Sequence, residues 1–407
     1  MTACIVCGGV VVREFLNLGR MSLANKFLTR EEVDRHDEAA YPLVVGFCPG
    51  CSHVQLTERV APPAMFDHYL YISSMSETLK NHLGDLAETM IGRLGLCATS
   101  LVVDVGSNDG TLLAAFKRHH TRILGVDPAA NLADLAKQNG VETVTAYFGQ
   151  ATAQRLLEQY GPASLITSTN SFPHIPDLQD FVKGVDVMLA PDGAMVIEAH
   201  YLRDLLEQNS FDTIYHEHVS YWALAPMKAL FARFDMEPVM VERLPLHHGQ
   251  IRVTFRRKGV TPIDSSVEQI LVEERAIGLD RFDTYEAFAR NARSLRNSLA
   301  TVLGDLMAQG KRVVGYGAPA KSSTLITFLK LGPNSIAYIA DKSPLKQGRF
   351  TPGAHIPVVS PERLLEDQPD YVVLLAWNFA DEIMAQQAEY RRRGGRFILP
   401  IPEVTIV

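Results

Sequence analysis

The sequence lacks the features that mark membrane, secreted and nucleic-acid-coating proteins. No apolar run approaches the roughly 18 residues that a membrane-spanning helix needs, and the N-terminus lacks the charged-then-apolar pattern of a secretory signal. Lysine and arginine total 39 against 46 aspartate and glutamate, a net charge of −7, whereas chains that coat nucleic acids are usually basic. We therefore expect a cytoplasmic protein that binds neither membranes nor nucleic acids.

Cysteine is also scarce, with five in 407 residues. In a reducing compartment such cysteines are ligands or core residues more often than disulfides. Cys4 and Cys7 form one C-x-x-C pair, and Cys48 and Cys51 form another. Two such pairs make the closed tetrahedral cage of a structural zinc site, with no open position for catalysis. Reduced core cysteines explain this double pairing less well, and Cys97, which stands alone, is expected to be packed.

A glycine-rich turn lies between a predicted strand and a predicted helix. The apolar run Leu101–Val105 indicates a buried parallel strand. The turn 106–110 follows, and the helical pattern Thr111–Arg118 comes after it. Strand, turn and helix in this order open a doubly wound domain, whose glycines let a ligand approach the backbone. A second strand, Ile123–Asp127, ends in an acid placed to accept hydrogen bonds from ribose hydroxyls.

The residues of this turn favour one ligand class over another. A dinucleotide site has the spacing G-x-G-x-x-G, whereas here Asp104 precedes Gly106 and Gly110, with Asn108 between the glycines. The pattern looks like motif I of class I methyltransferases, and it favours S-adenosylmethionine over a nicotinamide. Further strands are predicted at Ser164–Thr169, Ala194–Glu198, Glu237–Val241 and Ile251–Phe255. The predicted donor-binding residues are Asp104, Gly106, Asn108, Gly110, Asp127 and Asn170, the last beside the sulfonium.

A second half with the same organisation follows a helical connection. Residues 264–309 have helical spacing and predict two helices. The segment 312–320 reads as a strand and G-x-G-x-x-A, and Ile336–Ala340 is the next predicted strand. A glycine-rich helix start followed by lysine suits a diphosphate, but a nicotinamide or a domain that only packs remains an alternative. The loop Asp341–Val358 carries Lys342, Lys346 and Arg349, so the predicted substrate-binding residues of this half are Gly317, Lys321, Lys342 and Arg349.

Four proton-handling groups lie side by side at Tyr215-His216-Glu217-His218. Beside a methyl-donor site, such a cluster suggests that a carbanion is formed, and therefore that carbon is methylated. If the segment is extended, Tyr215 and Glu217 share one side and the two histidines the other; in a turn this division fails. The alternatives are a structural cluster and, less favoured by the spacing, a second metal site. His247-His248-Gly249 receives no role.

Taken together, the motifs identify a family. The chain resembles the S-adenosylmethionine-dependent C-methyltransferases of deoxysugar biosynthesis, which act on nucleotide-linked 4-keto-6-deoxy sugars. The resemblance implies an α/β protein with a zinc-binding domain over 1–75 and a central Rossmann-like class I methyltransferase domain over 76–258. Residues 259–407 would hold the helical connection and a second Rossmann-like domain. The motifs that carry the likeness are the cysteine pairs, 69–74, 106–110, 174–176, 215–218, 315–318, 352–358 and 376–378.

The resemblance also implies roles for individual residues. His218 matches the general base that removes the C3 proton, and Tyr215 and Glu217 match its supporting residues. His174 matches a second active-site histidine. Tyr69 is the favoured tyrosine that reaches the sugar, with Tyr71 as the other candidate, and His216 is the member of the cluster expected to have no role.

The predicted reaction is methylation at C3 of a nucleotide sugar, with dTDP as the expected nucleotide. The 4-ketone acidifies the neighbouring carbon, and an enolate forms before the methyl group is transferred. Three rival functions remain: methylation at C5, a nicotinamide oxidoreductase, and a non-catalytic zinc-ribbon interaction protein. We expect S-adenosylmethionine and a structural zinc as cofactors and a monomeric enzyme.

Overall fold

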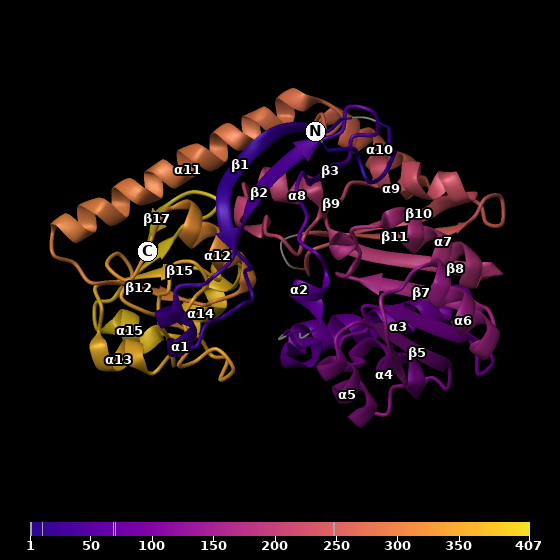
Figure 1. Cartoon of the computed structure of the whole chain (residues 1–407), viewed down its shortest axis with the longest axis horizontal. Coiled ribbons are helices and arrows are strands. Elements are labelled where there is room, and N and C mark those ends of the chain that lie inside the picture. The colour runs from indigo at the N-terminus through magenta and orange to yellow at the C-terminus, as the bar shows by residue number, and fades with distance from the viewer. Residues whose placement is uncertain (1, 10, 68, 70, 247–248) are drawn as a thin grey trace.

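The computed structural model describes residues 2–9, 11–67, 69, 71–246 and 249–407. Two α/β lobes stand beneath one long helix, α11 (Phe282–Ala308), with the N-terminal strands β1 (Arg13–Ser22) and β2 (Ala40–Phe47) between them (Figure 1). Within these ranges no helix is long and apolar enough to cross a membrane. Leu70 of the 69–74 motif and His247-His248 lie outside the described residues.

The larger lobe is built on a seven-stranded sheet in the order β10-β11-β8-β7-β4-β5-β6. The five strands from β8 to β6 are parallel, and β11 and β10 extend the sheet in antiparallel fashion. All five residues of the central strand β4 are buried, as expected for an apolar strand covered on both faces. The strands are β4 (Leu101–Val105), β5 (Arg122–Asp127), β6 (Thr143–Thr145), β7 (Ala163–Thr169), β8 (Leu189–His200), β10 (Met236–Leu244) and β11 (Gln250–Arg257).

Helices lie between the strands of the larger lobe in the chain. The strand predicted at Leu101–Val105 and the helix predicted at Thr111–Arg118 are confirmed with the predicted bounds. The other strands predicted in this lobe are confirmed and extend further than predicted. The helices are α3 (Glu77–Leu94), α4 (Thr111–Arg118), α5 (Ala130–Gln138), α6 (Gln150–Tyr160), η2 (Phe172–His174), α7 (Leu178–Met188), α8 (Leu202–Glu207), η3 (Phe211–Thr213), α9 (Leu224–Phe231) and η4 (Ala232–Phe234).

The smaller lobe has a six-stranded sheet in the order β14-β13-β12-β15-β16-β17, parallel except for its last strand. The strand predicted at Ile336–Ala340 is shorter than predicted, because the Ile336 N–H bonds the Gly332 carbonyl in a turn instead of a strand neighbour. The elements are β12 (Val313–Tyr316), α12 (Ala320–Phe328), β13 (Ile339–Ala340), β14 (Val358–Val359), α13 (Arg363–Asp367), β15 (Tyr371–Leu374), η6 (Trp377–Phe379), α14 (Ala380–Gln386), α15 (Ala388–Arg392), β16 (Arg396–Leu399) and β17 (Thr405–Ile406).

The N-terminal region forms a four-stranded antiparallel sheet, β1-β2-β3-β9. Its last strand, β9 (Ser220–Tyr221), follows the Tyr215–His218 cluster directly, so the cluster is tied to this sheet. The remaining elements of the region are β3 (Val54–Leu56), α1 (Arg30–Arg35), α2 (Pro63–Phe66) and η1 (Ser73–Met75).

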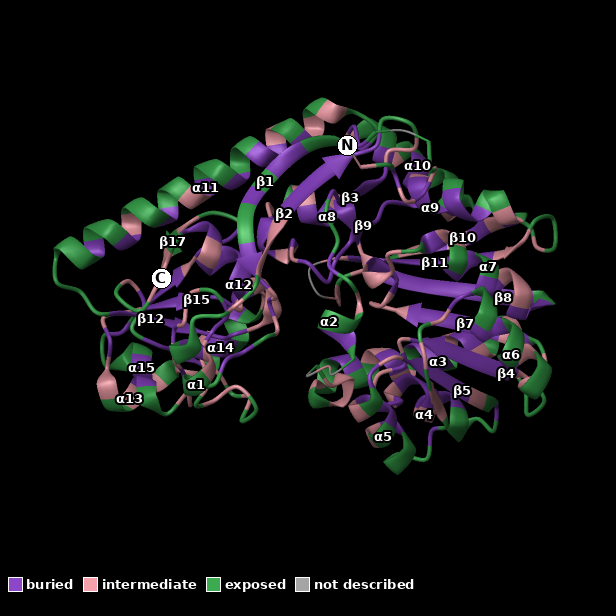
Figure 2. Ribbon diagram, viewed as in Figure 1, coloured by how far each residue is buried: buried purple, intermediate pink, exposed green. Residues whose placement is uncertain are grey.

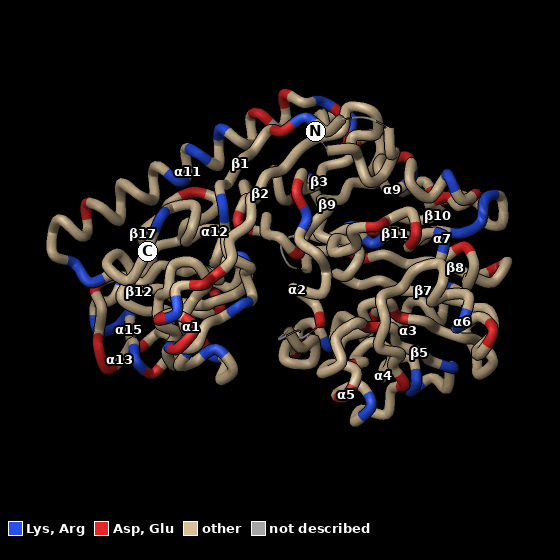
Figure 3. The backbone as a smooth tube through the Cα atoms, in the orientation of Figure 1, with Lys and Arg blue, Asp and Glu red and all other residues tan. Residues whose placement is uncertain are grey.

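The two predicted helices between the lobes are confirmed as α10 (Ser265–Ala276) and α11. Buried residues recur along α11 at helical spacing, and the Tyr285 ring stacks on Phe47 at 4.8 Å between centroids. Figure 2 shows this alternation of buried and exposed residues beside the almost wholly buried strands. Acidic and basic residues are interspersed around both lobes (Figure 3), in keeping with the nearly balanced composition.

The expectation that Cys97 packs in the core is wrong. Cys97 is exposed in the connection between α3 and β4. Its Sγ lies 3.2 Å from the Thr99 hydroxyl, and that hydrogen bond lowers the pKa of the thiol to about 7. The segment is a surface turn, where a cysteine gains no apolar partners.

Candidate active site and zinc centre

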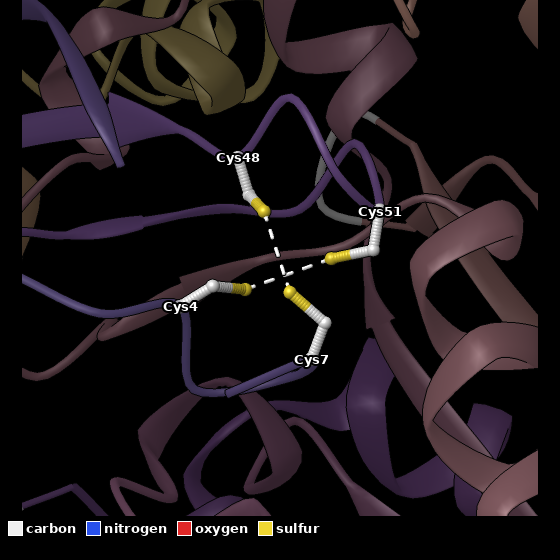
Figure 4. A group of neighbouring side chains, drawn as sticks. All are labelled: Cys4, Cys7, Cys48 and Cys51. Carbon is white, nitrogen blue, oxygen red and sulfur yellow. Dashed lines mark hydrogen bonds between the residues drawn. The ribbon is translucent and has the colours of Figure 1, made fainter. Parts of the chain in front are cut away.

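The two cysteine pairs meet at one point. The four sulfur atoms lie within 4.8 Å of one another, with Cys4 Sγ 3.5 Å from Cys51 Sγ and Cys7 Sγ 3.6 Å from Cys48 Sγ (Figure 4). A tetrahedral zinc with sulfur at about 2.3 Å requires sulfur–sulfur separations of about 3.8 Å, so the cage fits the ion closely. Burial and the neighbouring Cys4 raise the pKa of Cys48 to about 11, so a cation is needed to keep all four sulfurs as thiolates.

The carboxyl ends of the central strands carry the predicted donor-binding residues. Gly106 has φ +76°, and a Cβ there would lie 2.4 Å from the Ser171 side chain, so the turn requires glycine. Asn108 also has a positive φ, 53°, and its side chain bonds the backbone of Tyr71 and Ser73. The turn is therefore closed by the segment that follows the zinc-binding region.

Asp127 lies beside the turn at the end of β5. Its carboxylate accepts the backbone N–H of Asn108 and of Ala129, each at 2.9 Å. Gly106, Asn108 and Asp127 all line one cavity, and Asn170 at the end of β7 lines it as well. This is where open α/β sheets bind ligands, at the carboxyl ends of strands on either side of the switch in strand order.

Two predicted donor-binding residues do not line the cavity. Asp104 is buried in β4, where its Oδ1 accepts the Thr167 hydroxyl at 2.6 Å, and burial raises its pKa to about 7. Gly110 precedes α4, and a Cβ there would lie 2.9 Å from Val141. Both residues support the turn on the side away from the cavity. The spacing of residues in a motif cannot distinguish this role from contact with a ligand.

Tyr215–His218 forms a turn, with the His218 N–H bonded to the Tyr215 carbonyl, so the extended alternative does not apply. His218 Nδ1 lies 2.9 Å from the Thr213 carbonyl, which can only accept, so Nδ1 carries the proton. Nε2 is then the acceptor, and the Tyr215 hydroxyl donates to it at 2.9 Å. Burial lowers the pKa of His218 to about 3, which keeps the imidazole neutral.

Glu217 faces a tyrosine and an amide instead of a histidine. Its Oε2 accepts the Tyr69 hydroxyl at 2.8 Å, and its Oε1 accepts the Asn25 side-chain N–H at 2.7 Å. Burial raises the pKa of Glu217 to about 7, while these two hydrogen bonds act in the opposite direction. Glu217 is thus held by Tyr69 and Asn25, and it is the Thr213 carbonyl that orients His218.

Three histidine rings gather at the cavity. The His174 ring stacks on His218 with centroids 5.3 Å apart and on Phe66, also at 5.3 Å. His200, at the end of β8, lies 5.3 Å from His218. Burial, with a smaller contribution from His200, lowers the pKa of His174 to about 3. His200 escaped the sequence reasoning because β8 extends two residues beyond the predicted end at Glu198.

His216 points away from this group. Its Nε2 lies 3.3 and 3.2 Å from the carbonyls of Tyr41 and Pro42 in β2, and the ring is buried. It does not line the cavity. The residue expected to have no role in the chemistry is thus fixed to the N-terminal sheet.

The smaller lobe closes the far side of the cavity with two lysines. Lys321, at the start of α12, lies over the Trp377 ring at 4.0 Å, and burial lowers its pKa to about 8. Trp377 in turn donates its indole N–H to Asp212 of η3 at 2.7 Å. Lys346 lines the cavity too and donates to the Ala318 carbonyl at 2.8 Å.

Three predicted substrate-binding residues of this lobe lie elsewhere. Lys342 is exposed and lies 3.9 Å from Glu382, and Arg349 donates to the Phe27 carbonyl at 3.3 Å. Gly317 does not line the cavity, and a Cβ there would lie 2.5 Å from Ala376. Loop position alone could not tell Lys346, which faces the cavity, from Lys342, which faces solvent.

All three regions of the chain line this single cavity of about 780 Å³. The N-terminal region contributes Asn25, Tyr69 and the half-exposed Tyr71. The larger lobe contributes the predicted donor-binding residues that line the cavity and the three histidines, and the smaller lobe contributes Lys321 and Lys346. The volume lies within the range of pockets that hold cofactors and small-molecule substrates. The predicted donor-binding residues, the neutral His218 and the Lys321 ammonium thus share one cavity.

Comparison with known proteins identifies the family. Models described as "Putative zinc binding domain", "Methyltransferase domain" and "C-methyltransferase C-terminal domain" match residues 4–66, 77–241 and 245–402. The C-methyltransferase NovU of Streptomyces niveus is 37% identical over 406 residues, which are 99% of this chain and 96% of NovU. The chain belongs to the C-methyltransferase family. The resemblance drawn from the motifs is thereby confirmed.

More distant likenesses cover only part of the chain. The uncharacterized methyltransferase YcgJ of Bacillus subtilis (strain 168) is 24% identical over 195 residues, 45% of this chain and 74% of YcgJ. The solved structure of the PH0226 protein from Pyrococcus horikoshii OT3 covers 49% of this chain and 97% of its own at 13% identity, with a TM-score of 0.37, too low to argue from. From the full-length relative and the family models, the protein is an S-adenosylmethionine-dependent C-methyltransferase with an N-terminal zinc-binding domain.

Proposed function

We propose that this C-methyltransferase methylates C3 of a nucleotide-linked 4-keto-6-deoxy sugar, with dTDP as the nucleotide, after removing the C3 proton. One observation carries the proposal: Asp127 of the donor site, the Tyr215–His218 pair and Lys321 line the same cavity. Methylation of an oxygen needs no carbon deprotonation, whereas carbon next to a ketone must first become an enolate. A tyrosine–histidine base placed between the methyl-donor site and a lysine that can bind phosphate suits the methylation of carbon.

The base is the Tyr215–His218 pair. The neutral His218 ring is held by Thr213 with Nε2 toward Tyr215, so the pair can accept one proton in either of two ways. The C3 proton passes to the Tyr215 oxygen while the tyrosine proton passes to Nε2, or it reaches Nε2 directly after Tyr215 moves aside. Either route leaves an imidazolium whose Nδ1–H stays on the Thr213 carbonyl. The carbon keeps the electron pair of its broken C–H bond and shares it with the ketone as an enolate.

His174 is the donor to the developing enolate oxygen. Burial keeps its imidazole neutral, and a neutral imidazole N–H stabilises an oxyanion as a donor without becoming a competing acid. Tyr215 and Tyr69 are less suited to this task, since they donate their protons to His218 and to Glu217. Tyr69 instead presents lone pairs to a hydroxyl of the sugar, and Tyr71 lines the entrance on the same side.

Lys321 and Lys346 hold the diphosphate of the substrate. The Lys321 ammonium is partly buried over an indole ring, and the N-terminus of α12 adds to its attraction for a phosphate. A nicotinamide is less suited to this lobe, because Gly317 of its glycine motif does not line the cavity and is packed against Ala376.

Gly106, Asn108, Asp127 and Asn170 would hold S-adenosylmethionine at the strand ends. When bound there, it supplies the electrophilic methyl group that the enolate carbon takes up to complete the reaction. The zinc ion would keep the cage of Cys4, Cys7, Cys48 and Cys51 closed, and with four protein ligands it has no position for chemistry.

The test is incubation of the purified enzyme with S-adenosylmethionine and a panel of 4-keto nucleotide sugars, followed by NMR of the products. In D₂O with S-adenosylhomocysteine in place of the donor, deuterium is expected at C3. Deuterium entering at C5 alone would replace C3 with C5 methylation, the other carbon next to the ketone. Methyl transfer to oxygen, or reduction of the ketone with a nicotinamide, would overturn the proposal.

A further inference from the structure

A short N-terminal segment, residues 24–28, joins both lobes at the rim of the active-site cavity. On the smaller lobe, the Ala24 carbonyl accepts the Ser323 hydroxyl at 3.2 Å, and Leu28 exchanges two backbone hydrogen bonds with Phe350. Lys346 lies 5.2 Å from the centroid of the Phe27 ring. These contacts fix the backbone of the segment independently of the larger lobe.

On the larger lobe the segment makes a single polar contact with the catalytic cluster. The Asn25 side-chain N–H lies 2.7 Å from Glu217 Oε1, across 192 residues of sequence. The other carboxylate oxygen of Glu217 accepts the Tyr69 hydroxyl. Tyr69 and Asn25 thus both donate to Glu217, an arrangement that suits the ionised carboxylate.

We propose that Asn25 is a positioning residue of the active site, which holds Glu217 as a carboxylate so that Glu217 keeps the Tyr69 hydroxyl turned away from the substrate. The proposal rests on the proposed function, in which Tyr69 offers lone pairs to the sugar. It gives the N-terminal zinc-binding region a part in the chemistry, because β1 leads from the cysteine cage to this segment.

The expected pH effect follows from the groups that face Glu217. These are Tyr69, from the segment before α3, and Tyr215 of its own turn, both of which burial and the Glu217 charge keep neutral. The hydrogen bonds from Tyr69 and from Asn25 both lower the pKa of Glu217 against the effect of burial. Removing that donor must raise the pKa, so the carboxylate form is reached only at higher pH.

The experiment compares Asn25→Leu and Asn25→Asp with the neighbouring exposed control Lys26→Gln. The Glu217 titration is followed by NMR of ¹³C-labelled glutamate carboxyls, with Glu217→Gln to assign the signal. We expect the midpoint to rise by about one pH unit or more in both Asn25 variants, since a hydrogen bond to a charged group is worth about that much. Asn25→Asp preserves the shape of the side chain if Asn25→Leu fails to fold.

Kinetics provide the second readout. For a midpoint that moves from about 7 to about 8, the ionised fraction at pH 7 falls about fivefold, so kcat should fall by that factor and recover at higher pH. The KM for S-adenosylmethionine and the zinc content should not change, and Lys26→Gln should match the wild type. An unchanged Glu217 midpoint overturns the proposal whatever the substrate is. A shifted midpoint without methylation of any 4-keto sugar by the wild type overturns the proposed function instead.

Discussion

The Tyr215 hydroxyl lies 2.9 Å from Nε2 of His218, the ring nitrogen that has no proton. A tyrosine in this position either relays the substrate proton or must move before the histidine can act. The two residues are three apart in the sequence and meet because the segment turns. Their pairing makes the base a property of two side chains.

Replacement of Tyr215 by phenylalanine separates the relay from direct transfer. If the tyrosine relays the proton, Tyr215→Phe should lower kcat by about 100-fold or more, the usual contribution of a positioned acid–base group. Deuterium exchange at C3 should slow equally, because both report proton removal. His218→Gln should abolish both. Exchange that stays at the wild-type rate in Tyr215→Phe would show that Nε2 removes the proton directly.

The pH dependence of kcat should report Glu217. Burial raises its pKa to about 7, whereas the pKa values of His218 and His174 are lowered to about 3. Because the hydrogen bonds to Glu217 suit the carboxylate, kcat should rise with pH up to about 7 and level off above it. Well below the midpoint the rate should fall about tenfold per pH unit.

The matching control is Glu217→Gln, which cannot ionise. Its kcat should be low and should not change between about pH 5.5 and pH 8, since the histidines are neutral throughout that range. If kcat of Glu217→Gln still rose with pH near pH 7, the titrating group would be a residue other than Glu217. Rates of methyl transfer measured at saturating substrate across this pH range give the dependence of kcat on pH.

The sequence predicted the two α/β halves well and the contacts of the site less well. Strand and helix boundaries near Leu101–Val105 follow from local apolar runs, and the four-cysteine cage follows from local spacing. One partner of Glu217 is Asn25, 192 residues away, and only the folded chain brings them together. His200 carried a usable signal, a polar residue at a strand end, but the predicted strand stopped short of it.

Loss of one cysteine ligand should release the zinc and destabilise the N-terminal region. Cys48→Ser removes one corner of the cage, so we expect less than one zinc per chain by metal analysis and a lower midpoint of thermal unfolding. Binding of S-adenosylhomocysteine should persist, because Gly106, Asp127 and Asn170 belong to the larger lobe. The exposed Cys97 is the control, and Cys97→Ser should retain both the metal and the stability.

Asp127 should contribute directly to binding of the methyl donor. Its carboxylate lines the cavity, and hydrogen bonds from ribose hydroxyls to a charged group are worth about 1.5–3 kcal/mol. Asp127→Asn should therefore weaken S-adenosylhomocysteine about tenfold to a hundredfold in calorimetric titrations. Asp134→Asn, on the exposed face of α5, controls for the loss of one negative charge. Equal affinities for Asp127→Asn and the wild type would place the ribose elsewhere.

Lys321 and Lys342, two lysines of the smaller lobe, offer a matched test of the proposed diphosphate site. Lys321 is partly buried over Trp377 at the cavity, whereas the Lys342 side chain is 58% exposed and pairs with Glu382 at 3.9 Å. Lys321→Met should raise the KM for the nucleotide sugar about tenfold or more, since charge-assisted hydrogen bonds to phosphate are strong. The KM for S-adenosylmethionine should stay the same. Lys342→Met should change neither constant by more than about twofold, because an exposed ion pair contributes little. If Lys342→Met raised the sugar KM as much as Lys321→Met does, the diphosphate would lie on the outer loop and not at Lys321.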